Sequence, residues 1–188
     1  VNLYSVDQDK SYPVTDGMSE VSDPVFDKSG KYLYFLSSTD AGPVKQWFDM
    51  SNADMQMNSS LYILCLKKDS ISPLAKESDE EKVSDVKDAK QDKKPDDKSK
   101  KEQSIVIDFD NINNRILALP VPAGKYSNLK TGNEGEIYYL ESGSDNSSKL
   151  HKFDLKKRKD EVVLEKVNNY EISYDRSKLL YMSSRSWF

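Results

Sequence analysis

A strand motif returns three times along the chain with the same order of side chains. Each copy opens a short alternating apolar run, reaches a polar or Lys-rich turn, and resumes as a second short strand. The copies begin at Leu3-Tyr4-x-Val6, Leu61-Tyr62-x-Leu64 and Leu150-His151-x-Phe153, and their second strands are expected at Tyr12-Pro13-Val14, Pro73-Leu74-Ala75 and Val162-Val163-Leu164. One such unit cannot bury its own apolar face and must stack on the next. The sequence therefore predicts a repeat scaffold built from β-strands.

A second recurring unit is a tight turn that leads into an apolar strand ending in Ser-Ser. Its copies are Val25–Lys31 before Tyr32–Ser38 and Tyr174–Lys178 before Leu179–Ser184, with a looser copy at Thr131–Leu140. Asp hydrogen-bonds to the local backbone and Gly accepts a positive φ, so both suit a tight turn. The strands in the first and looser copies are apolar on both faces. We expect those strands to be buried between layers.

Interleaving the two units gives a regular order of outer and inner strand pairs. The expected pairs span residues 3–14, 24–38, 60–75, 126–141, 149–164 and 168–184. The last two inner pairs end 43 residues apart, close to the ~40–50 residues of a propeller blade. The predicted fold class is all-β, with antiparallel four-stranded blades of a partial β-propeller, roughly two to three blades. A further pair, Ile105–Phe109 and Arg115–Leu119, either completes an interrupted blade or begins another.

One segment divides the chain by its composition. Lys76 to Gln103 holds 9 basic and 10 acidic side chains among 28 residues. Its low hydrophobicity cannot offset the ~1–2 kcal/mol per residue of backbone ordering entropy, so we expect it to be disordered. The predicted organisation is blades in residues 1–75, a charged disordered insertion in 76–103, and further blades in 104–188. A second insertion, Asp40–Ser59, carries aromatic and Met residues and is apolar enough to pack on something.

Composition excludes several classes of function. The net charge is -4, and the basic residues are scattered, so nothing favours nucleic acid as a partner. The single cysteine, Cys65, allows no internal disulfide, which fits a cytoplasmic or a periplasmic location equally. No apolar run approaches the ~20 residues of a membrane span. The chain opens at Val1 with no leader pattern, and we expect an internal fragment of a longer protein.

The motifs of catalytic sites are missing from this sequence. It has no Gly-x-Ser-x-Gly elbow, no Gly-rich phosphate loop and no His-Glu-x-x-His. The only histidine, His151, occupies the repeat position of Tyr4 and Tyr62, so we expect a strand side chain in an aromatic slot rather than a catalytic base. Cys65 lies in an alternating run, where a structural thiol is expected rather than a nucleophile. The sequence predicts no catalytic, cofactor-binding or metal-binding residue, and no cofactor.

Two short patterns resemble sites but have simpler explanations. Asp108–Asn113 is similar to the start of a calcium loop, yet Asn113 stands where Gly is required and Leu119 where Glu is required, so a turn is expected. The triplets at Asn58 and Asn146 fit the glycosylation pattern, which matters only in a eukaryotic secretory route.

Three stretches of the chain together resemble the propeller repeats of tricorn-like proteases. The first, Ser22–Ser38, carries an Asp-x-x-Gly-Lys turn that many propellers share. The other two are more specific in this order, and they are Ser72–Glu81 and Ile107–Gly124. The resemblance covers the chain from about residue 2 to Trp187.

The resemblance implies that this stretch has a non-catalytic role. In that family, two propellers precede a PDZ-like module and a serine-peptidase region, and the propellers form a path and filter for peptides. No catalytic residue of the family falls within these residues. The implied function is a non-catalytic propeller segment in substrate access or domain assembly, and the alternative is a stand-alone module for protein–protein contact. The implied partners are the remaining blades and peptidase domains of the parent chain, with peptides, and we expect the parent protein to be an oligomer.

Overall fold

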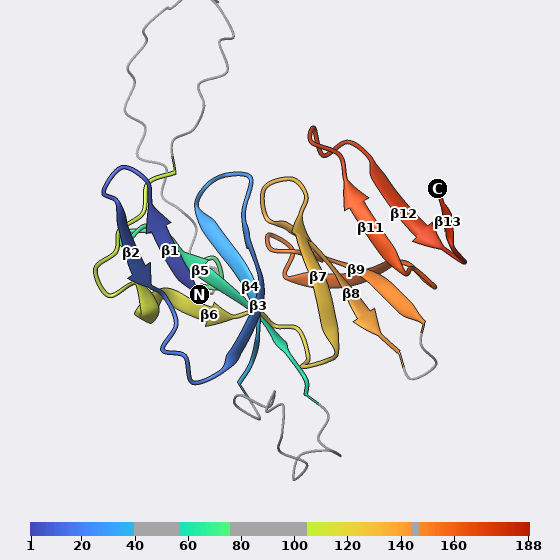
Figure 1. The fold of residues 1–188 in the computed structure, drawn as a ribbon, viewed down its shortest axis with the longest axis horizontal. Helices are drawn as coiled ribbons and strands as arrows, with labels where there is room; N and C mark the ends of the chain where they lie inside the picture. The colour runs from blue at the N-terminus through green and yellow to red at the C-terminus, as the bar shows by residue number, and fades with distance from the viewer. Residues whose placement is uncertain (40–56, 76–104, 144–146) are drawn as a thin grey trace, which may run out of the picture.

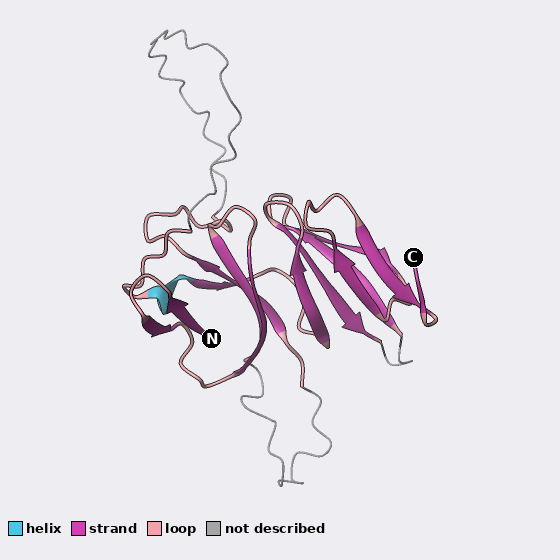
Figure 2. Cartoon of the chain, turned by 45° about the horizontal axis from the view of Figure 1, so that its top comes forward, coloured by secondary structure: helices cyan, strands magenta, loops and turns pink. Residues whose placement is uncertain are grey.

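The computed structural model describes residues 1–39, 57–75, 105–143 and 147–188. In these residues the chain is built from antiparallel strands, and a single short 3-10 helix, η2 (Ile112–Arg115), is the one helical element. Figure 2 shows this arrangement. The all-β prediction is confirmed. The predicted disorder of Lys76–Gln103 and the packing of most of Asp40–Ser59 concern residues outside the described ones.

The strands form two complete four-stranded sheets and two smaller ones, side by side (Figure 1). The first complete sheet contains β3 (Glu20–Phe26), β4 (Tyr32–Ser38), β5 (Ser60–Cys65) and β6 (Ile116–Ala118). The second contains β7 (Tyr126–Thr131), β8 (Glu136–Ser142), β9 (Ser148–Asp154) and β10 (Lys159–Leu164). A two-stranded sheet, β1 (Asn2–Ser5) and β2 (Lys10–Pro13), precedes them, and a three-stranded sheet follows them, made of β11 (Asn169–Ile172), β12 (Leu179–Ser183) and β13 (Ser186–Trp187). The described chain thus holds two whole blades and parts of two others.

The structure decides between the two possibilities for the strand pair after the charged segment. Residues 105–109 form no strand, whereas Ile116–Ala118 pairs with β5, with Tyr62 opposite Ala118. The pair therefore completes the first full sheet across the insertion. The predicted second strand at Pro73–Ala75 is wrong, because this stretch is a turn in which the Ala75 N–H donates to the Ser72 carbonyl, and the edge of β5 is taken by β6.

Strand β4 is buried on both faces, as its sequence predicts. Its side chains alternate between two interfaces, because successive residues of a strand point to opposite sides. Tyr34 and Leu36 face the second complete sheet, and Leu33 and Phe35 face β1 and β2. Each fully buried Leu or Phe contributes about 1.5–3 kcal/mol to stability relative to an exposed position. The apolar content of this strand therefore stabilises two interfaces at once.

Three apolar cores hold the four sheets together. The central core lies between the two complete sheets and contains Tyr34, Leu36, Leu61, Ile63, Leu119, Val121, Leu129, Ile137, Tyr139, Phe153 and Leu155. A first core joins β1 and β2 to the sheet β3–β6 and includes Leu3, Val14, Leu33, Phe35 and Leu64. A third core joins β7–β10 to β11–β13 through Leu140, Leu150, Val167 and Tyr170.

Candidate functional site

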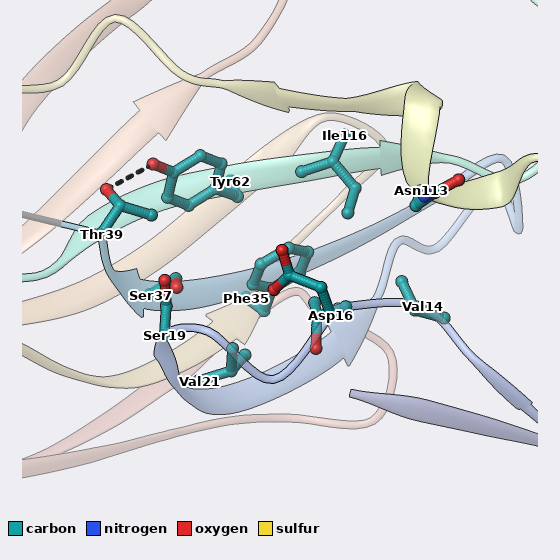
Figure 3. A pocket seen from close by; sticks show the side chains of 11 residues that line it. Val14, Asp16, Ser19, Val21, Phe35, Ser37, Thr39, Tyr62, Asn113 and Ile116 are labelled. Atoms are coloured by element: carbon teal, nitrogen blue, oxygen red, sulfur yellow. Dashed lines mark hydrogen bonds between the residues drawn. The ribbon is translucent and has the colours of Figure 1, made fainter. Parts of the chain in front are cut away.

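A cavity of about 270 Å³ opens on the face of β4 and β5 that is turned toward β1 and β2. Figure 3 shows its lining side chains, which come from β3, β4, β5, η2, β6 and the segments that follow β2 and β4. The residues used below are Val21, Phe35, Ser37, Tyr62 and Ile116, with Asp16 at the edge. This cavity is the candidate site, because it combines an apolar floor with a few polar groups.

The floor of the cavity is aromatic and its margin carries hydroxyl groups. The rings of Phe35 and Tyr62 stack with centroids 5.6 Å apart and planes 12° apart. The Tyr62 hydroxyl lies 2.8 Å from Thr39 Oγ1, as the dashed line in Figure 3 marks. The exposed Asp16 carboxylate accepts a hydrogen bond from the Met18 N–H at 2.9 Å. Such a lining can hold an apolar side chain, and it offers no paired base and nucleophile.

Five of the lining residues, on the strands β3 to β6, have counterparts at equivalent positions of the sheet β7–β10. Strand register relates them, because Val21 stands opposite Ser37 in one sheet as Tyr126 stands opposite Glu141 in the other. By the same registers Phe35, Tyr62 and Ile116 correspond to Tyr139, His151 and Asp160. We call Tyr126, Tyr139, Glu141, His151 and Asp160 the charged cluster. The same positions are thus apolar or hydroxylated in one sheet and titratable in the next.

His151 sits at the centre of the charged cluster. Its Nδ1 lies 2.7 Å from Asp160 Oδ2, and its Nε2 lies 3.0 Å from Glu141 Oε2. The ring stacks on Tyr139 with centroids 5.2 Å apart, and only 8% of the residue is exposed. The hydrogen bond to Asp160 raises the pKa of His151; burial opposes this rise, and the charges of Asp160 and Glu141 add to it.

Asp160 is shared between two donors. Its Oδ1 accepts the Tyr139 hydroxyl at 2.6 Å, while Oδ2 faces His151. Burial alone would raise the pKa of Asp160, but the hydrogen bonds from His151 and Tyr139 outweigh it, so this pKa is lowered. The pKa of Tyr139 is raised, first by burial and then by its bond to Asp160. Burial, followed by the charges of Glu141 and Asp160, raises the pKa of Tyr126 to about 12.

The structure places His151 in the aromatic slot that the repeat predicts, in β9 opposite Tyr139. Sequence reasoning missed the two carboxylates that bind it. Glu141 and Asp160 come from the strands on either side of β9, and only the register brings them to the same ring. Both ring nitrogens lie within 3.0 Å of a carboxylate oxygen, and this arrangement favours the protonated form of the ring.

Cys65 lies at the end of β5 and is buried. Burial raises the pKa of the thiol, and the nearby charge of Arg115 opposes that rise. A raised pKa disfavours the thiolate, so this environment suits a structural side chain.

The stretch Asp108–Asn113 folds as a turn around a guanidinium group. Arg115 donates to the carbonyl oxygens of Cys65, Asp108 and Asp110. The Asp108 carboxylate accepts the Lys68 N–H at 2.8 Å. Three oxygens of this stretch, namely the Asp108 carboxylate oxygen Oδ2 and the carbonyl oxygens of Asp108 and Asp110, are therefore bonded to the protein's own donors.

The remaining sequence motifs are placed as follows. Asn58 is exposed just before β5, and Asn146 lies outside the described residues. Ser37 and Ser38 end β4 and are buried. Among the described residues, no group of three or more His, Cys, Asp and Glu side chains is arranged to hold a metal ion. No helix in the described ranges is long and apolar enough to span a membrane.

Comparisons with known proteins agree on one family. The family model described as the tricorn protease second beta propeller domain matches residues 1–188. The tricorn protease homolog 2 of Streptomyces coelicolor is 24% identical over 185 residues, which cover 90% of this chain and 15% of that protein. A crystal structure of the tricorn protease is similar with a TM-score of 0.63 and 19% identity, over 96% of this chain and 17% of that one. The chain thus spans less than a fifth of either relative.

The structural likeness shows the fold, and the family match gives the identity. The chain belongs to the family of the tricorn protease second beta propeller domain.

Proposed function

We propose that this chain is a non-catalytic part of a propeller wall in a tricorn-like serine peptidase, acting in domain assembly and in the passage of peptides. The observation that carries the proposal is the continuous contact between the first strands of successive sheets. Thr131 Oγ1 in β7 donates to the Phe26 carbonyl in β3 at 3.0 Å. The Tyr170 hydroxyl in β11 donates to the Asn128 carbonyl in β7 at 2.6 Å. In a propeller the first strands of the blades surround a central channel.

Side chains of the first strands β7 and β11 also contact each other directly. Asn128 Nδ2 donates to Asn169 Oδ1 at 2.9 Å, and the Lys130 ammonium pairs with Glu171 at 2.5 Å. These contacts fix β7 against β11. A fixed wall supports a channel of constant width, which is what a filter for extended peptides requires.

The test uses the whole protein that contains this chain. Ser22 and Ser127 are exposed, and they occupy equivalent positions on the first strands of the two complete sheets. We expect the double variant Ser22→Arg and Ser127→Arg to slow turnover of long peptides several-fold while short peptides are cleaved at the parental rate. The matched control is Val163→Arg in β10, on the fourth strand.

Two outcomes contradict the proposal. Equal effects on long and short peptides would show that the wall does not filter by size. A whole protein with no peptidase activity and no peptidase region would instead favour the stand-alone interaction module.

A further inference from the structure

A groove with a volume of about 500 Å³ lies between the two complete sheets, at the end where their first and third strands lead into turns. Each of these sheets has four strands in the described residues, so both sides of the groove are complete. The lining residues used below are Tyr32 and Pro73 on the side of β3–β6, and Glu134, Leu155, Lys156 and Arg158 on the side of β7–β10.

The floor of this groove is apolar and held in place. Leu155 is 7% exposed and belongs to the central core, against which Tyr32 also packs. The Leu155 N–H donates to the Gly135 carbonyl at 2.9 Å. Gly135 has a φ of +74°, and a Cβ added to it would lie 3.3 Å from Leu155 Cβ, so a glycine suits this close approach. The floor is therefore preorganised, which lowers the ordering cost of binding.

The rim of the groove carries two cations. Lys156 and Arg158 are exposed in the turn between β9 and β10. Among the described residues, neither of them is paired with a carboxylate, whereas the neighbouring Lys157 and Lys159 each form an ion pair with a carboxylate. The Arg158 guanidinium donates instead to the backbone carbonyl of Ala75. The groove thus keeps two positive charges that the described side chains do not neutralise.

The turn that carries these cations is fixed by the Asp154 carboxylate. Its Oδ1 accepts the backbone N–H groups of Lys156 and Lys157, both at 3.0 Å. Glu134, the carboxylate among the described lining residues, pairs with Lys31 at 2.7 Å. Glu134 therefore leaves the two rim cations available to a ligand.

The turns around the groove are basic, although the chain as a whole is acidic. Residues 27–31, 66–75, 132–135 and 155–158 hold seven basic and three acidic side chains, whereas the whole chain has a net charge of -4. An apolar floor beside such cations complements a ligand that is acidic and also carries an aliphatic side chain. A nucleic acid fits less well, because it would bring its phosphates to Glu134 and has no aliphatic side chain for the floor.

We propose that this groove binds an acidic peptide segment of a partner protein, with one aliphatic side chain over Leu155 and carboxylates beside Lys156 and Arg158. The site is separate from the channel wall proposed above. Exposed ion pairs contribute little individually, so the aliphatic side chain supplies much of the affinity and the carboxylates supply the specificity.

The experiment titrates the whole protein that contains this chain into a fluorescein-labelled peptide, Asp-Glu-Glu-Leu-Glu-Asp, and follows fluorescence polarisation. We expect saturable binding that weakens as the salt concentration rises. The double variant Lys156→Gln and Arg158→Gln is expected to weaken binding about tenfold, which corresponds to about 1.4 kcal/mol. The matched control, Lys157→Gln and Lys159→Gln, removes the same charge from neighbouring positions and is expected to bind like the parent.

The peptide has matched controls of its own. With Ser in place of Leu it is expected to bind several-fold more weakly, because the floor loses its apolar ligand. With Lys in place of every acidic residue it is expected not to bind. Equal binding of either altered peptide would overturn the proposal.

Other outcomes would also overturn it. Absence of binding, or equal losses in the two double variants, would show that the attraction is not located in the groove. Displacement of the peptide by a duplex oligonucleotide would identify nucleic acid as the ligand. A several-fold gain in affinity when residues 76–103 are replaced by a Gly/Ser linker would identify the chain's own acidic residues as the occupant. Turnover of short peptides is expected to be the same in both double variants, so this site and the wall function can fail separately.

Discussion

The carboxylate of Asp27 accepts a hydrogen bond from the backbone N–H of Gly135 at 2.9 Å, although 108 residues separate them in the chain. Asp27 lies in the turn between β3 and β4, and Gly135 lies in the turn between β7 and β8. Asp27 is only 3% exposed, and it also accepts hydrogen bonds from Ser29 and the Tyr34 hydroxyl. One side chain thus closes its own turn and joins two blades.

Replacing Asp27 tests this link. We expect Asp27→Ala to lower the free energy of unfolding by about 2–4 kcal/mol, because the buried N–H of Gly135 loses its acceptor together with the local donors. Asp27→Asn keeps an acceptor oxygen and is expected to lose less. The measurement is denaturant unfolding. The matched control is Asp175→Ala, since the Asp175 carboxylate accepts hydrogen bonds from Ser173 and Ser177 within its own exposed turn. Equal losses for Asp27→Ala and Asp175→Ala would contradict the inter-blade role.

The charged cluster predicts a pH dependence. The pKa of His151 in the folded chain is raised above its unfolded value, chiefly by the hydrogen bond to Asp160. The folded state therefore binds this proton more tightly, and the stabilisation is complete below about pH 6.5 and lost as pH rises through the raised pKa. We expect the thermal midpoint to fall on this alkaline side in the parent chain and to be flatter in His151→Phe. Parallel pH profiles of the two proteins would refute the prediction.

Asp160 predicts the behaviour at acid pH. Its pKa is lowered in the folded chain, so its contribution is present above the unfolded value of about 3.9 and lost as pH falls through the lowered pKa. Asp160→Asn is expected to remove this acid sensitivity and to lower the pKa of His151. NMR titration of the imidazole measures that pKa directly. An unchanged His151 titration in Asp160→Asn would show that the two groups are not coupled.

The isolated chain is expected not to hydrolyse peptides. Peptide hydrolysis by a serine route needs an activated hydroxyl, a base and donors for the oxyanion. His151, the only imidazole, has carboxylates at both ring nitrogens. Fluorogenic peptides incubated with residues 1–188 and with His151→Phe provide the measurement. Turnover in the parent that disappears in the variant would make His151 a base and overturn this expectation.

Replacing Lys76–Gln103 with a short Gly/Ser linker is expected to leave the melting temperature within a few degrees of the parent. The strands on either side, β5 and β6, already pair in one sheet through Tyr62–Ala118 and Leu64–Ile116. Closing a loop of a different length costs only about 0.6 kcal/mol per doubling. Thermal unfolding followed by circular dichroism tests this. Loss of a cooperative transition would show that the segment contributes structure.

The periodic features of the fold were predictable from the sequence, because they depend on alternation along single strands. The repeats at Leu3, Leu61 and Leu150 all lie in strands that correspond to third positions of a blade. The partner of β5 was not predictable, because Pro73–Ala75 is close to it in sequence while β6 is about fifty residues away. β6 pairs with β5 nevertheless, because Ile116 and Leu117 pack against the apolar cores on the two faces of the sheet.

The turns show a second limit of sequence comparison. The two hairpin turns align in sequence by matching Asp27 with Asp175. The strand registers instead match Asp27 with Ser173, because Phe26 faces Leu33 as Ile172 faces Leu179. In one turn Ser29 donates to Asp27, and in the other Ser173 donates to Asp175, so donor and acceptor have exchanged places. A sequence alignment cannot detect this exchange, because the two turns share the Ser–Asp hydrogen bond but not the position of either residue.

The charged cluster could not be predicted from the sequence for a similar reason. His151 meets Glu141 and Asp160 across two strand pairings, and β10 contains an irregularity between Val162 and Leu164. Diagonal neighbours across strands depend on register, and a single sequence does not fix register across loops.

The correspondence between the cavity lining and the charged cluster shows that equivalent positions carry different side chains in the two complete sheets. These side chains distinguish the contact face of one blade from that of the next. Val21, Phe35 and Ile116 occupy the positions that Tyr126, Tyr139 and Asp160 occupy one blade later. A chain with these two blades exchanged would set ionised groups against a surface shaped for hydrocarbon, and burying an unpaired charge is costly. Circular permutants that keep the order of neighbours should therefore be tolerated, whereas shuffled ones should not. Although their strands share one register, the two blades are therefore not interchangeable at their contact faces.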